Sequence, residues 1–289
     1  MQPLWKSHIV KQMTGPDDPE FQTTLQDALG QVLPMDVIEI ADELVERQTR
    51  LFVNLKNDLA ESGVPSTDVF SAVTHSKANA RILLSYFSDS DLARSAVGKV
   101  FDALLNGEAH AAERIAVFVE KLGALEPRLA LELATGLLNN TDPQQHWLWT
   151  RWLWDPTSGT GALPLLAGST YNLARTGSGT YPLANSLADG YIRVGAVTAM
   201  SIKFGEVTGL FTPELLCDEK RALFANSAFL ACVYSVYLYG TTSWRLSREF
   251  NRLLPTLPGM ARRLLGLKKT GSATPLDQIK ETNLHGRQI

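Results

Sequence analysis

Metal-bridging chemistry is the first possibility that residue types and spacing suggest. His110 and Glu113 form an H-x-x-E pair at helical spacing, and Glu39, Glu43 and Glu46 fall along one predicted helix. A carboxylate-bridged pair of metal ions takes Glu-x-x-His motifs from two facing helices. Because the sequence has no such pair of motifs, we interpret these carboxylates as solvated helix faces.

Glycine-rich turns raise phosphate binding or nucleophilic catalysis as the next possibilities. Residues 159–161 read Gly-Thr-Gly and residues 177–179 read Gly-Ser-Gly. Neither turn follows a strand and precedes Lys-Ser/Thr, as a phosphate-binding loop requires, and the nucleophile-elbow pattern is incomplete. We therefore assign no catalytic, cofactor-binding or metal-ligating residue and expect no cofactor. Whether the chain is an enzyme is left open.

Tryptophans are the first group suited to contact another surface, and four of them fall within residues 146–156. On a helix, Trp147 and Trp154 would share one face, and Trp149 and Trp152 would share another. They would serve as an interfacial belt at a lipid or polymer surface, or as a wall for a hydrophobic ligand. Burial between two subdomains is the alternative that needs no function.

Basic residues form the second such group. Residues 245–269 hold seven Lys/Arg and one Glu, and Leu246 and Phe250 can line one face of a helix there. This pattern is typical of a segment that binds anionic lipid or an acidic protein, although an ordinary solvated helix face has the same pattern. Nucleic acid is not expected as a partner, because no binding fold is identifiable. The seven basic residues are Arg245, Arg248, Arg252, Arg262, Arg263, Lys268 and Lys269.

The longest uncharged run, residues 222–244, is long enough to cross a bilayer. It also carries Asn226, Ser227, Ser235 and three tyrosines, so we favour the axis of a helical core over contact with lipid. Small residues such as Ala228 recur along it and allow another helix to approach closely. We expect residues 191–205 to be that partner, with Gly195 facing the small residues, so that the two segments form a hairpin.

Helices are the elements that must position all these residues. Apolar residues recur at steps of three and four from residue 36 onward, which predicts an all-α fold. Short connections predict antiparallel neighbours. Thr212 and Pro213 are typical of a helix start, and that helix is expected to run from about residue 214 to 254. The other predicted helices cover residues 36–63, 77–88, 91–107, 108–123 and 126–140.

Composition divides the chain into five parts. Residues 1–154 hold 13 Lys/Arg and 21 Asp/Glu, a net charge of −8, and residues 155–289 hold 14 and 9, a net charge of +5. An acidic half followed by a basic half indicates two surfaces of opposite character. The predicted parts are an N-terminal tail (1–16), an acidic helical bundle (17–154), a Gly/Ser/Pro-rich loop (155–190), an apolar hairpin with a basic amphipathic segment (191–269) and a polar tail (270–289).

Cys217 and Cys232 indicate the compartment. If both lie on one helix, their 15-residue spacing separates them by about 22 Å, too far for a disulfide. Reduced cysteines and the lack of a secretory leader predict a cytoplasmic protein, with peripheral association with a membrane or hydrophobic particle as a further expectation.

The sequence therefore predicts a non-catalytic helical adaptor or assembly factor. Its Trp-rich and basic-apolar second half would engage a protein partner, or a lipid or hydrophobic-particle surface, and self-association is left open. The alternative is a soluble helical enzyme or carrier that holds an apolar ligand, acyl or isoprenoid-like, between the bundle and the hairpin.

Overall fold

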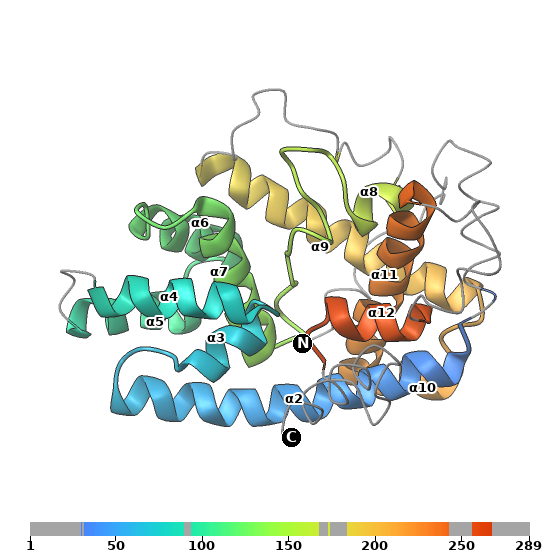
Figure 1. Cartoon of the computed structure of the whole chain (residues 1–289), viewed down its shortest axis with the longest axis horizontal. Helices are drawn as coiled ribbons and strands as arrows, with labels where there is room; N and C mark the ends of the chain where they lie inside the picture. Colours follow the sequence, from blue (N-terminus) through green and yellow to red (C-terminus); the bar gives the residue numbers. More distant parts are fainter. Residues whose placement is uncertain are drawn as a thin grey trace, which may run out of the picture.

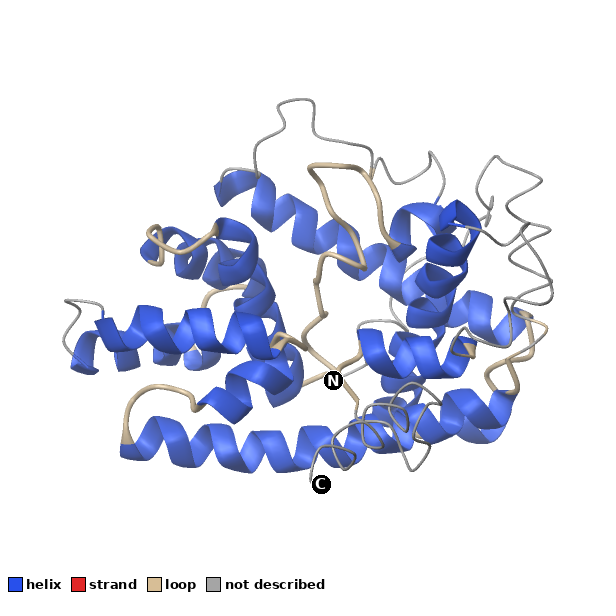
Figure 2. Ribbon diagram, in the orientation of Figure 1, coloured by secondary structure: helices blue, strands red, loops and turns tan. Residues whose placement is uncertain are grey.

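The computed structural model describes residues 30, 32–89, 94–167, 173, 184–242 and 256–267. Within those residues the regular elements are helices, apart from one isolated antiparallel bridge between Asp155 and Thr160 (Figure 2). The all-α prediction is confirmed.

Five helices of the first half lie close to the predicted ranges, and one short helix, Thr67–Val73, was not predicted. The helices of this half are α2 (Pro34–Glu61), α3 (Thr67–Val73), α4 (Lys77–Asp89), α5 (Arg94–Asn106), α6 (Ala111–Lys121) and α7 (Pro127–Thr141). The face of α2 that bears Val37, Ile40 and Leu44 is buried, as expected for an amphipathic helix. Ser66 precedes α3, and its hydroxyl accepts a hydrogen bond from the Val69 N–H, which satisfies a free donor at the helix start.

The second half contains α8 (Ala162–Ala167), α9 (Ala184–Val207), α10 (Pro213–Cys217), α11 (Glu219–Thr242) and α12 (Leu257–Leu264). The predicted continuous helix from residue 214 is wrong, because it breaks at Asp218. Asp218 has extended backbone angles (φ −99°, ψ 101°), and its Oδ1 accepts the Arg221 N–H at 3.0 Å, as an N-cap of α11 would. Cys217 and Cys232 therefore lie on different helices. Residues beyond Thr242 in the predicted helix lie outside the described residues.

The predicted loop at 155–190 is also partly wrong, because residues 155–167 are folded and α9 begins at residue 184. The Asp155 carboxylate accepts hydrogen bonds from the Thr157 N–H and hydroxyl at 2.9 and 2.6 Å. Burial alone would raise the pKa of Asp155, but these hydrogen bonds and nearby Arg151 outweigh it and lower the pKa. A charged group thus fixes the turn that leads into α8.

Two long helices connect the two halves (Figure 1). α2 runs along the base beneath both groups of helices and packs most extensively against α11, while α9 crosses the top from α6 to α8 and α11. α11 therefore has α2 and α12 as its main partners, and the expected hairpin partner α9 contributes less of its packing. The division into separate 17–154 and 191–269 units stays a prediction.

α11 answers the question of core or lipid. Among the described residues it is the one helix that is long and apolar enough to span a membrane. However, 72% of the apolar stretch within it is buried inside the protein. Asn226 within it is paired with α9: its Oδ1 accepts the Ser201 hydroxyl at 2.8 Å, and its Nδ2 donates to the Thr198 carbonyl at 3.1 Å. The part of the charge-free run that the structure describes, residues 222–242, belongs to a core helix.

Candidate functional site

The Trp-rich segment, residues 146–156, does not form a helix. Residues 146–150 have no regular secondary structure, and Thr135 of α7 supplies hydrogen bonds instead. The Thr135 hydroxyl accepts from the Trp149 N–H at 3.2 Å and lies 3.0 Å from the Trp149 carbonyl oxygen. Further along, the carbonyls of Trp152 and Leu153 accept the N–H groups of Ala162 and Leu163 at 2.9 Å. Backbone pairing with distant residues replaces the helical pattern.

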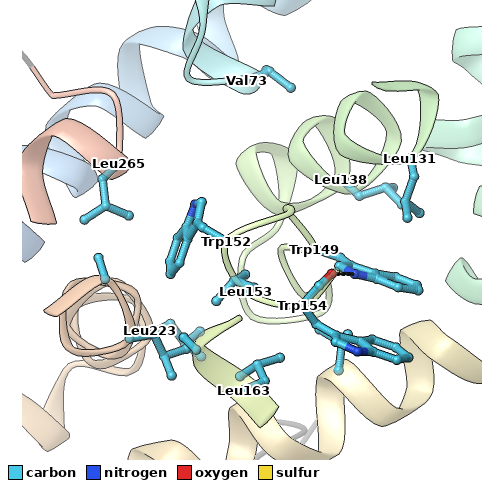
Figure 3. Close-up of a cluster of buried hydrophobic side chains, with 14 of the residues drawn as sticks. Val73, Leu131, Leu138, Trp149, Trp152, Leu153, Trp154, Leu163, Leu223 and Leu265 are labelled. Carbon is cyan, nitrogen blue, oxygen red and sulfur yellow. Dashed lines mark hydrogen bonds between the residues drawn. The ribbon is translucent and has the colours of Figure 1, made fainter. Parts of the chain in front are cut away.

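Three of the four tryptophans are buried in the core. Trp149 and Trp154 stack in parallel, while Trp152 points to the other side, toward α11, where its ring centroid is 6.4 Å from that of Tyr234 (Figure 3). The solvent-exposed fractions of Trp149, Trp152 and Trp154 are only 1%, 8% and 3%. These three residues are therefore not exposed to a lipid or partner surface in this structure. Their burial agrees with the alternative in which they pack between the two halves of the protein.

Trp147 is the partly exposed member, and it contacts α9. The backbone N–H of Trp147 donates to the Tyr191 hydroxyl at 2.8 Å. Burial raises the pKa of Tyr191. Gly195 packs directly on the indole, since a Cβ there would lie 2.2 Å from Trp147 Nε1. The expectation that Gly195 faces the small residues of α11 is wrong, because this tryptophan lies against Gly195.

Only two of the seven predicted basic contact residues lie in the part of the chain that the structure describes. Arg245, Arg248, Arg252, Lys268 and Lys269 lie outside the described residues. Arg262 of α12 is committed to the protein itself: its Nε donates to Glu43 at 2.8 Å and its Nη2 contacts Glu39 at 3.3 Å. In this structure Arg262 is paired within the protein, and its role as a contact for lipid or a partner stays a prediction. Arg263 is exposed and keeps the predicted availability.

α12 has no free apolar face to insert into lipid. Leu257, Ala261 and Leu265 are buried against the rest of the protein, and the helix packs on α11 and α2. A basic amphipathic helix binds membranes by burying its apolar face in the bilayer. In this docked position, α12 offers only its polar side.

An open apolar groove lies elsewhere, between α5 and α6. Its volume is about 240 Å³. Leu104 and Phe118 form its buried base, while Val117 keeps 45% of its surface exposed. Charged residues also line the groove. The residues lining the groove are Val100, Ala103, Leu104, Gly107, Glu108, Ala109, Glu113, Arg114, Val117, Phe118 and Lys121.

Arg114 fixes the two walls of the groove to each other. From α6, its Nη1 donates to the carbonyl oxygens of Leu104 and Leu105 at 2.5 and 3.0 Å. These carbonyls lie in the last turn of α5, which lacks further helical donors and carries partial negative charge. This contact therefore joins α6 to the end of α5. The only sequence feature that could have indicated this groove is Val117, an exposed valine on an otherwise amphipathic helix.

The histidines and carboxylates considered first do not form a metal centre. Among the residues that the structure describes, no group of three His, Cys, Asp or Glu side chains is placed to hold a metal ion. Glu39 and Glu43 pair with Arg262, and burial lowers the pKa of His146.

Comparison with known proteins adds no relative: no protein-family model matches the chain, and neither a curated protein nor a solved structure is significantly similar to it.

Proposed function

We propose that the protein is a non-catalytic helical adaptor and that the α5–α6 groove binds an apolar helix of a protein partner. The observation that carries this proposal is Val117, which is 45% exposed beside the open, mostly apolar groove of about 240 Å³. Exposed apolar surface with a charged rim is typical of sites for amphipathic helices.

The size and charge of the groove suggest what would bind. A volume of 240 Å³ is below the roughly 300–1,000 Å³ of common small-molecule pockets, which suits one or two apolar side chains of a helix. Glu113 lies in the first turn of α6 and Lys121 in its last turn. A partner helix with a basic residue near Glu113 and an acidic residue near Lys121 would complement both.

The basic segment at 245–269 remains a proposed second contact, for an acidic protein or an anionic surface. Exposed Arg263 supports it, and internally paired Arg262 does not. The carrier alternative has less support, because the stacked Trp149 and Trp154 occupy the space between the two halves where an acyl or isoprenoid-like ligand was expected.

The test places a photo-crosslinking amino acid at Val117 in one variant and at Val53 of α2 in another. Val53 is a matched control, because it is a helical valine with 51% exposure that is absent from the groove lining. We expect the Val117 variant to crosslink a specific partner and the Val53 variant to crosslink none. Equal crosslinking from the two positions would contradict the groove as the binding site.

Affinity then measures the contribution of the groove. With the crosslinked partner purified, Val117→Asp should weaken binding at least about tenfold, because it places a carboxylate against an apolar surface without a hydrogen-bond partner. Val53→Asp should leave the affinity within about twofold. Catalytic turnover of any substrate by the purified protein would contradict the non-catalytic part of the proposal.

A further inference from the structure

The outer face of α6 carries one apolar residue among charged ones. Glu113, Val117, Glu120 and Lys121 are exposed, whereas Ile115 on the inner side is buried. Residues three and four positions apart share one face of a helix, so Val117 lies at the centre of the exposed face. This face also forms one side of the α5–α6 groove, because Glu113, Val117 and Lys121 are among the residues that line it.

The charges on this face have opposite signs on the two sides of Val117. Glu113 lies four residues before Val117 and Lys121 lies four residues after it, while Arg114 lies three residues before and Glu120 three residues after. Each charge is therefore matched by the opposite charge at the same distance on the other side. Such an order is complementary to a reversed copy of the same helix.

Two-fold symmetry supplies that reversed copy. In a dimer with its two-fold axis beside Val117, a residue before Val117 faces the residue at the same distance after Val117 in the second copy. Glu113 then faces Lys121 of the second copy, Arg114 faces Glu120, and the two Val117 side chains meet at the centre. Parallel copies would instead place each carboxylate against its own equivalent, and like charges repel.

Three of these charged side chains have no ion-pair partner within the described part of the chain. Glu113, Glu120 and Lys121 take part in none of its ion pairs. Arg114 is different, because its guanidinium already donates to two carbonyl oxygens of α5. Glu113 and Lys121 are therefore the charges that best distinguish an antiparallel copy from other partners.

We infer that the helix bound at the α5–α6 groove is α6 of a second copy of this chain, in an antiparallel two-fold dimer. This inference rests on the proposed function of the groove and names its partner. Val117 of each copy supplies the apolar contact, and the Glu113–Lys121 pair, formed twice by symmetry, sets the direction. One helix of 11 residues per subunit provides fewer than the roughly 20–30 residues of a standard interface, so the dimer should be weak and concentration-dependent.

The test measures self-association of the purified chain by sedimentation equilibrium at low salt. The parent should form a dimer as concentration rises. Glu113→Lys and Lys121→Glu should each weaken dimerisation at least about tenfold, because each places like charges opposite each other twice. Glu61→Lys is the matched control, since Glu61 is an exposed carboxylate of α2 that is absent from the groove lining. It should leave the affinity within about twofold.

An equimolar mixture of the two groove variants gives the sharpest result. The Glu113→Lys chain is basic at both positions and the Lys121→Glu chain is acidic at both, so both pairs in a mixed dimer are attractive. We expect the mixture to dimerise with about the parental affinity, which would also show that both variants are folded. Failure of the mixture to associate, or a parent dimer that neither substitution weakens, would overturn the inference.

A second measurement needs no change of charge. Photo-crosslinking from Val117 in the purified chain alone should give a covalent dimer joined at α5 or α6. A chain that stays monomeric at every concentration, or a crosslink to another part of the second copy, would overturn the inference. If Val117 crosslinks a different protein in a cell extract while the purified chain stays monomeric, the inference is wrong and the proposed function of the groove still holds.

Discussion

The indole rings of Trp149 and Trp154 stack with their centroids 5.2 Å apart and their planes within 6° of parallel. Trp149 Nε1 also donates to the Trp154 carbonyl at 2.9 Å. α9 reaches this pair through Gly190, where a Cβ would lie 2.5 Å from the Trp149 ring and 3.4 Å from the Trp154 ring. The stack therefore depends on a residue without a side chain in the facing helix.

The first prediction concerns that close approach. Gly190→Ala should lower the free energy of unfolding by roughly 1–3 kcal/mol, because the buried Trp149 indole must move to admit the new methyl group. Gly98→Ala, in α5, is the matched control. Its nearest neighbours would be Gly63 atoms at 3.8 Å, so better helix propensity should stabilise the protein by about 0.5–1 kcal/mol. Chemical denaturation of both variants measures the difference. A Gly190→Ala protein as stable as the parent would contradict the packing described.

Local sequence patterns predict the first half well, because each of its helices repeats apolar residues at helical spacing and ends near a capping or breaking residue. Val37, Ile40 and Leu44 of α2 are buried as predicted, and α5 ends directly before Gly107. Such signals act within one helix, so one sequence is enough to read them.

Features set by distant residues could not be predicted in the same way. The tryptophans of the Trp-rich segment are spaced as on a helix, but the Thr135 hydroxyl binds the backbone of Trp149 outside a helix. No residue near Trp149 in the sequence indicates this contact. The packing of α2 against α11 likewise joins residues about 180 positions apart, as the 2.6 Å contact between Asp42 and Arg221 illustrates. The α5–α6 groove arises only from such packing.

The second prediction separates two neighbouring arginines of α12. Arg262 has 16% of its side-chain surface exposed and pairs with Glu39 and Glu43. Arg262→Gln should therefore lower the free energy of unfolding by about 1–3 kcal/mol, since the partly buried carboxylate of Glu43 loses a charged donor. Arg263→Gln should change it by less than about 0.5 kcal/mol, because Arg263 is exposed. Urea denaturation at low salt measures both values. Equal effects of the two substitutions would contradict the docking of α12 through Arg262.

The last prediction concerns pH. Burial and the positive charge of Arg47 lower the pKa of His75 from the usual 6.5 to about 3. Between these values, the unfolded chain binds a proton at His75 that the folded protein excludes, so stability is complete above pH 6.5 and falls as pH decreases toward 3. This one group should remove about 2 kcal/mol from the free energy of unfolding between pH 7 and pH 5. His75 has a positive φ of 54°. His75→Asn keeps a residue that tolerates this conformation and removes the titration. It should be less stable than the parent at pH 7 but lose less stability on acidification, as urea denaturation at each pH would measure. The same pH dependence in the parent and in His75→Asn would show that other groups cause it.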